Sequence, residues 1–158
     1  MFKISYLIFI TIVLFSCKNC QNSKTNTITN NELGSTIGNI HNNRIENLIN
    51  IIEASNCVYG KGVGIAGKPN QTYEAFSELN NLASDSLLFK LTYHNNTILK
   101  IYAYKALVER NSNLAKKVQD RLKFDTATFC NQINDISFNC SVSNYVIKVK
   151  PPAISSVQ

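Results

Sequence analysis

The chemistry that this sequence can carry rests first on its cysteines, of which it has five. Cys130 and Cys140 lie close together within residues 124–150, a segment whose apolar residues do not follow helical periodicity. A bridge between them would close a short loop and stabilise the fold by roughly 2–3 kcal/mol. We therefore expect a Cys130–Cys140 disulfide. Cys57 is expected to be a buried, reduced thiol at a helix end, and Cys20 lies in a polar stretch.

The glycines of residues 59–69 (YGKGVGIAGKP) imitate two nucleotide-binding motifs. Gly62, Gly64 and Gly67 have the spacing of the dinucleotide fingerprint, and Lys68 completes most of a phosphate-binding loop. Both motifs require a strand before the glycines and a helix N-terminus after them. We expect a helix before this segment, and Pro69 stands where the phosphate loop carries a metal-binding hydroxyl. The sequence therefore predicts no nucleotide site and no cofactor.

Two interpretations of the glycine segment remain. The first is a loop whose backbone passes close to neighbouring helices, which only glycine permits. The alternative is a ligand-binding or enzymatic protein in which the loop between Gly60 and Gly67, with Tyr59 and Tyr73, forms the rim of a pocket.

Metal and acid–base chemistry find little support. His41 and His94 are far apart, and neither has a cysteine or carboxylate at the spacing of a metal ligand. Glu74 and Glu78 are four residues apart beside an apolar helix face, which is typical of a solvated surface rather than of a catalytic pair. We predict no metal site, no catalytic residues and no enzymatic activity.

Residues 1–16 form a targeting segment, with Lys3 followed by the apolar run 4–15. That run is shorter than the roughly 20 residues that a membrane-spanning helix requires. Its end, Leu14-Phe15-Ser16-Cys17, resembles a bacterial lipobox, although Phe15 departs from the commonest pattern. The resemblance implies that Cys17 is lipidated after the signal peptide is recognised. Residues 17–43 are polar and are predicted to be a flexible tether.

These features place the domain outside the cytoplasm. The predicted location is the bacterial cell envelope, with the protein anchored to a membrane by its N-terminal lipid, and to the outer membrane if the source has two. The net charge of +6 includes four basic residues on one helix, Lys116, Lys117, Arg121 and Lys123. Asp120 interrupts them and no aromatic residue interleaves, which favours a solvated face over a nucleic-acid site.

Residues 44–123 have the periodicity of five helices. The apolar spacing and the polar caps predict them at 44–55, 72–83, 84–93, 97–110 and 112–123. The helix at 97–110 has two apolar faces on nearly opposite sides, one with Leu99, Tyr102, Ala103 and Ala106, which indicates a helix packed on both sides. Its expected N-cap is Thr97, and that of the preceding helix is Ser84 or Asp85.

The two helices around the turn at residues 94–96 form a helical hairpin, and LTYHNNTILKIYAYKAL resembles a HEAT-type repeat. Lys100, Ala103, Ala106 and Leu107 occupy the basic and small apolar places of its second helix. The longer run from residue 58 through the hairpin resembles small HEAT-like envelope lipoproteins of the flavobacterial kind. This resemblance implies a fold and a compartment but no reaction.

The sequence thus predicts an all-α fold. It comprises a short HEAT-like helical stack at 44–123, an irregular C-terminal segment at 124–150 and a tail at 151–158. The expected function is protein–protein interaction in the envelope, with an unidentified envelope protein as partner, because helical stacks offer broad surfaces without catalytic machinery.

Overall fold

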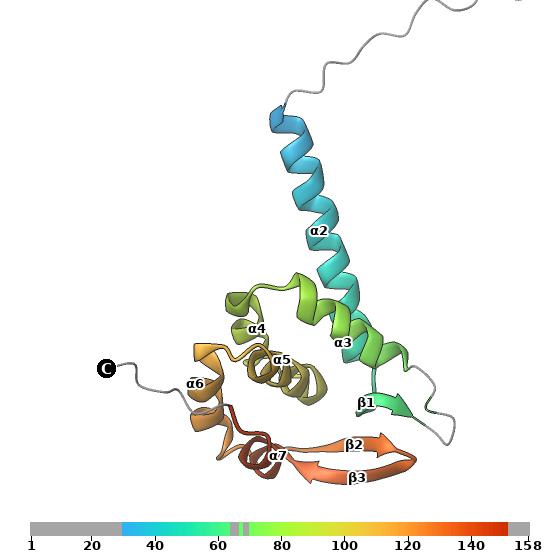
Figure 1. The fold of residues 1–158 in the computed structure, drawn as a ribbon, viewed down its shortest axis with the longest axis vertical. Coiled ribbons are helices and arrows are strands. Elements are labelled where there is room, and N and C mark those ends of the chain that lie inside the picture. The colour runs from blue at the N-terminus through green and yellow to red at the C-terminus, as the bar shows by residue number, and fades with distance from the viewer. Residues whose placement is uncertain (1–29, 64–66, 68–69, 152–158) are drawn as a thin grey trace, which may run out of the picture. The chain divides into compact units, whose positions relative to one another are not determined.

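The computed structural model describes residues 30–63, 67 and 70–151. Contacts divide the chain into residues 1–37 and 38–158, and the compact fold belongs to the second unit. Its elements follow one another as a helix, a strand, four helices, two strands and a final helix (Figure 1). They are α2 (Asn30–Glu53), β1 (Cys57–Val63), α3 (Gln71–Leu82), α4 (Asp85–Leu91), α5 (Thr97–Glu109), α6 (Asn113–Leu122), β2 (Thr128–Asn134), β3 (Ile136–Ser141) and α7 (Val142–Lys148).

Helix α5 lies at the centre of the core, between α3 and α4 on one side and the sheet and α7 on the other (Figure 1). Its buried side chains cover nearly the whole circumference: Ile98, Leu99, Ile101, Tyr102, Ala103, Tyr104, Ala106 and Leu107. The prediction of a helix packed on both sides is confirmed. Burial all round explains why this helix, unlike α6, has no single polar face.

Side-chain caps begin five of the helices. Asn70, Ser84, Asn96, Ser112 and Ser141 each accept a hydrogen bond from a backbone N–H of the first helical turn. Of the two caps predicted for α4, Ser84 or Asp85, the structure has Ser84, whereas the cap of α5 is Asn96 and not Thr97. The amide of Asn96 also donates to Glu53 O at 3.0 Å, so the start of α5 is tied to the end of α2.

A three-stranded sheet contradicts the prediction of an all-α, HEAT-like stack. Its order is β1-β2-β3, with β1 parallel to β2 and β2 antiparallel to β3. Helices α3 to α6 form the connection between the two parallel strands, which cannot be joined by a tight turn. The fold is therefore mixed α/β, because the glycine segment pairs with a strand that is far away in the sequence.

The predicted domain boundaries change accordingly. Residues 124–150, expected to be irregular, contain β2, β3 and α7. The expected tether at 17–43 overlaps α2, which begins at Asn30, while residues 17–29 lie outside the described part of the chain.

The C-terminal helix α7 is fixed to both the core helix and the sheet. The hydroxyl of Tyr104 donates to Val149 O at 2.5 Å, and burial raises the pKa of this hydroxyl to about 12. The rings of Phe129 and Tyr145 meet edge to face with centroids 5.5 Å apart. These contacts join α5, β2 and α7 into one core.

An ion pair fixes the junction between the helices and the hairpin. Lys100 Nζ on α5 lies 2.9 Å from Asp125 Oδ2 just before β2. The other carboxylate oxygen of Asp125 accepts the N–H of Ala127 at 3.0 Å, and its carbonyl accepts the N–H of Ser143 at 2.9 Å. Partial burial of the carboxyl raises its pKa, but the hydrogen bonds from Lys100 and Ala127 outweigh burial and leave the pKa of Asp125 below its usual value.

Candidate functional site: the disulfide-linked sheet and its free edge

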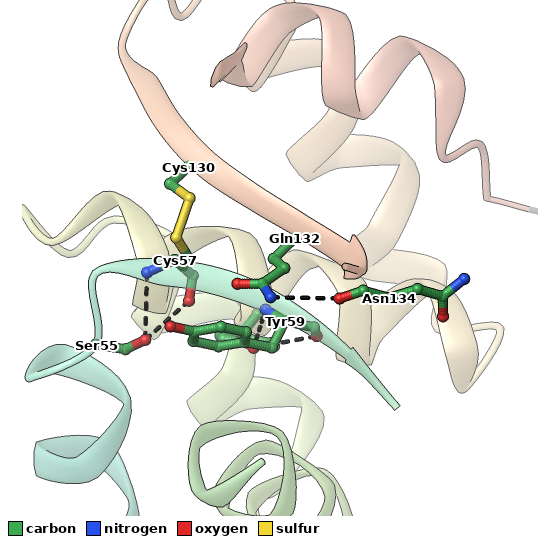
Figure 2. Close-up of a disulfide and its surroundings, with 7 residues drawn as sticks. Ser55, Cys57, Tyr59, Cys130, Gln132 and Asn134 are labelled. Atoms are coloured by element: carbon green, nitrogen blue, oxygen red, sulfur yellow. Dashed lines mark hydrogen bonds between the residues drawn. A yellow bond between two sulfur atoms is a disulfide. The ribbon is translucent and has the colours of Figure 1, made fainter. Parts of the chain in front are cut away.

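A disulfide between Cys57 and Cys130 links the two parallel strands (Figure 2). The two residues are direct partners in the β1–β2 register, with Cα atoms 4.5 Å apart, within the range for a bridge. Ser55 fixes the entry to β1, because its hydroxyl donates to Cys57 O at 2.8 Å and accepts the Cys57 N–H at 3.4 Å. The bridge closes a covalent loop across a sequence separation of 73.

The predicted Cys130–Cys140 bridge is therefore wrong. In the β2–β3 register Cys130 is opposite Asn139, and Cys140 is opposite Phe129. Because side chains alternate between the two faces of a strand, this offset of one residue directs the two cysteines to opposite faces of the hairpin. Cys140 is a free, half-buried thiol packed against the core. Cys57, expected to be a reduced thiol at a helix end, is bridged in a strand.

Tyr102 connects β1 to the central helix. Its hydroxyl accepts the Tyr59 N–H at 2.7 Å and donates to Tyr59 O at 3.2 Å. Burial raises the pKa of Tyr102 well above its ordinary value, so the hydroxyl stays protonated and can both donate and accept. One buried side chain thus satisfies both backbone groups of Tyr59, beside the bulge where the β1–β2 register shifts.

The hairpin of β2 and β3 has one apolar face, which is buried in the core at the base of the hairpin and exposed at its tip. At the base of this face Phe129 and Asn131 are buried. Farther along, Ile133, Ile136 and Phe138 are exposed by 52%, 69% and 43%. These three apolar side chains, which we call the tip cluster, share a face because Ile133 pairs with Ile136 and Phe138 pairs with Asn131.

The outer edge of β3 is free in the described part of the chain. Alternate pairs of an antiparallel ladder exchange hydrogen bonds. The Val142 N–H donates to Ala127 O, so the adjacent Thr128–Ser141 pair is not a hydrogen-bonded pair. Following this alternation along the ladder, the backbone N–H and C=O groups of Ser137 and Asn139 are directed away from β2. All residues from 133 to 139 are exposed.

This edge has none of the usual devices that prevent pairing with another strand. Charged residues, prolines and bulges normally serve that purpose. The sequences of β2, TFCNQIN, and β3, ISFNCS, contain neither charge nor proline, and their register is continuous from 128 to 141. Asp135, in the turn between the two strands, is the one acidic residue in the sequence from 128 to 141. The edge can therefore accept an extended segment through its backbone and apolar contacts through the tip cluster.

The glycine segment has a different context from the predicted one. A strand, β1, leads into it, and Gly60 and Gly62 lie within that strand. A Cβ atom added at Gly62 would come within 3.2 Å of the backbone of Gly67, which has a φ of +58°. Close backbone packing therefore explains the glycine at position 62, and the positive φ explains the one at position 67. Residues 64–66, which belong to the proposed pocket rim, and residues 68–69 lie outside the described residues.

The remaining predicted residues are placed as follows. Cys17 and Cys20 lie outside the described residues. His94 is in the α4–α5 turn, with Nδ1 at 3.2 Å from the Asn96 N–H nitrogen. Glu78 forms a two-point ion pair with Arg44, and the hydrogen bond from Arg44 lowers the pKa of Glu78. Among the described residues, no three metal-binding side chains gather.

Sequence reasoning missed the tip cluster and the Cys57–Cys130 bridge. The alternation of residues 128–141 around Asn134-Asp135 was a usable signal for the hairpin.

No helix in the described part has the length and apolar character needed to cross a membrane. No protein-family model matches the chain, and neither a curated protein nor a solved structure is significantly similar to it.

Proposed function

We propose that this protein is a lipid-anchored component of the bacterial cell envelope that binds another envelope protein through the free edge of β3. The observation that carries the proposal is the tip cluster beside an uncharged, unprotected strand edge. Strand addition uses such edges, with backbone hydrogen bonds supplying affinity and alternate side chains supplying specificity. The partner that fits is an extended segment with apolar residues at alternate positions.

Two features support the envelope location. The disulfide between Cys57 and Cys130 joins strands within the folded domain, and such bridges persist in oxidising compartments. The lipobox-like end at Cys17 would add acyl chains, each buried CH₂ of which contributes about 0.8 kcal/mol to membrane attachment. The anchor would keep the domain at the membrane surface, where envelope partners are concentrated.

The anchor is tested by labelling cells with a radioactive or clickable fatty acid. We expect the full chain to incorporate the label and the Cys17→Ala variant to lose it entirely, because the thiol is the acceptor. A Cys20→Ala variant is the matched control and should remain labelled. Undiminished labelling of Cys17→Ala would remove the lipoprotein proposal without touching the proposal about the β3 edge.

The binding edge is tested with a photo-crosslinking amino acid placed in the full chain in living cells. At Ile136 it should give one dominant covalent product, whereas at Lys116, an exposed position on α6, it should not. Asn139→Pro removes an N–H that is directed away from β2, so it should abolish the product and leave the hairpin intact. Thermal unfolding of Asn139→Pro checks that the fold persists.

Three outcomes contradict the proposal. Equal products from both probe positions would mean nonspecific contact. A product that survives both Asn139→Pro and Phe138→Ser would mean that the edge and the tip cluster are not used. A product of twice the mass of the chain would show pairing with a second copy in place of another envelope protein.

A further inference from the structure

A second surface, independent of the hairpin, is built from cations laid over aromatic rings. Lys117 Nζ on α6 lies 5.3 Å from the centroid of the Phe89 ring on α4. Arg121 Cζ lies 3.8 Å from the centroid of Tyr93, and the rings of Phe89 and Tyr93 meet edge to face at 5.4 Å. The aromatic residues that were not found along α6 are therefore supplied by its neighbour.

The ends of α4 and α6 are joined at this surface. Arg121 Nη2 donates to the carbonyl oxygen of Thr92 at 2.9 Å and to its hydroxyl at 2.7 Å. Tyr93 and Phe124 each follow the last residue of their helix by two positions, and they are 55% and 77% exposed. Lys123 Nζ lies 5.1 Å from the Phe124 ring. Two exposed aromatic rings thus lie beside basic side chains where the C-terminal ends of α4 and α6 are joined.

The surface keeps a net positive charge. Asp120 is the one acidic residue of α6, and it is shared by Lys116 at 3.0 Å and Lys123 at 3.3 Å. Asp125 is paired with Lys100. No carboxylate forms an ion pair with Lys117 or Arg121 in the described part of the chain, and the charge of the exposed Lys117 remains available to an anionic partner.

We propose that this basic aromatic surface, formed by Phe89, Tyr93, Lys117, Arg121, Lys123 and Phe124, docks the domain on an anionic membrane surface. Aromatic rings beside Lys and Arg are the residues that settle at the boundary between headgroups and acyl chains. Basic side chains at that level are attracted to anionic headgroups. Phe124 is the apolar residue that enters the boundary, and Lys117 and Lys123 meet the headgroups.

A membrane fits this surface better than a single-stranded nucleic acid does. Binding of unpaired bases requires aromatic faces that are free for stacking. Here Arg121 covers a face of Tyr93, and Lys117 is placed over Phe89. The headgroup layer of a membrane does not require free ring faces, because basic side chains and aromatic rings can contact it side by side. The proposal does not depend on lipidation of Cys17.

The absence of tryptophan from the sequence permits a direct test. The full-length Phe124→Trp protein carries one such fluorophore and is reconstituted into vesicles of phosphatidylcholine alone or mixed with phosphatidylglycerol. In the anionic vesicles we expect its emission to shift to shorter wavelength and to be quenched by brominated acyl chains. The Ile136→Trp protein, with its reporter on the hairpin, is the matched control and should show neither change.

Charge removal sharpens the test. In the Phe124→Trp background, Lys117→Gln and Lys123→Gln should each lower the ratio of docked to undocked protein by roughly fivefold, and added salt should lower it further. Circular dichroism checks that these exposed substitutions leave the fold unchanged. Identical emission of the Phe124→Trp protein in both kinds of vesicle overturns the proposal. Quenching that is unchanged by the two lysine substitutions and by added salt overturns it as well. Quenching by an oligonucleotide but not by anionic vesicles would also overturn it.

Discussion

Helix α5 and the sheet are stabilised in different ways. The helix is surrounded by side chains, and its buried residues lie within one continuous stretch of sequence. The sheet joins residues that are 73 positions apart, carries a covalent bridge at its parallel pair, and exposes apolar residues at its tip. The helix is therefore held by packing, whereas the sheet combines packing at its base with a crosslink and leaves surface at its tip available for a partner.

The largest effect that tests this contrast is loss of the bridge. Cys57→Ser should lower the free energy of unfolding by about 4 kcal/mol, because the bridge closes a long loop in the unfolded chain. Chemical denaturation measures the change. Cys140→Ser is the control and should have a much smaller effect. Peptide mapping that finds a Cys130–Cys140 link in the native protein would contradict the assignment.

Overpacking the helix should have the next largest effect. Ala106 is 1% exposed, so Ala106→Leu must displace neighbouring side chains and should destabilise by about 1–3 kcal/mol. The same denaturation experiment measures it. Glu109→Gln, an exposed change on the same helix, should cost far less. Similar small losses from both variants would mean that α5 is not enclosed on both sides.

The hydrogen bonds of the Tyr102 hydroxyl, which join helix α5 to strand β1, can be removed with little change in side-chain volume. Tyr102→Phe leaves the backbone N–H and carbonyl of Tyr59 without their hydroxyl partner and should cost about 1–2 kcal/mol. We expect faster amide hydrogen exchange at Tyr59 than in the unaltered chain, with α6 unchanged. Uniformly faster exchange in β1 and α6 alike would show that Tyr102 supports the whole core rather than the strand.

The smallest effect concerns the ion pair at the junction. Because the pKa of Asp125 is lowered in the folded state, its contribution is present above the unfolded pKa and disappears as the pH falls through the folded value. Asp125→Asn should cost about 1 kcal/mol at pH 7 and much less in acid below the usual aspartate range. Unfolding measured across pH decides this, and a loss independent of pH would contradict it.

The same contrast explains what could be predicted from the sequence. The α4–α5 hairpin follows from the spacing of Leu87, Leu88 and Leu91, the Ser84 cap and the two apolar faces of α5, all of which are local signals. Strand β1 was missed because Gly60 and Gly62 lower strand propensity. What makes it a strand is pairing with β2, which no local pattern indicates.

The candidate sites show the same difference between features set by local sequence and features set by distant contacts. The one-residue offset that separates Cys130 from Cys140 follows from a two-residue turn, and the sequence carried that information in Asn134-Asp135. The pairing of Cys57 with Cys130 requires knowledge of the parallel register. The basic aromatic surface requires knowing that α4 lies against α6, because its rings and its cations come from different helices.

The loop closed by Cys57 and Cys130 also has a mechanical consequence. Helices α3 to α6 lie inside this covalent ring, whereas α2 and β3 lie outside it. Tension applied between the N-terminal side and the hairpin passes from Cys57 to Cys130 through the sulfur atoms, so the enclosed helices carry no load. A pull on a partner strand held at β3 would reach the N-terminal end of the chain without extending helices α3 to α6.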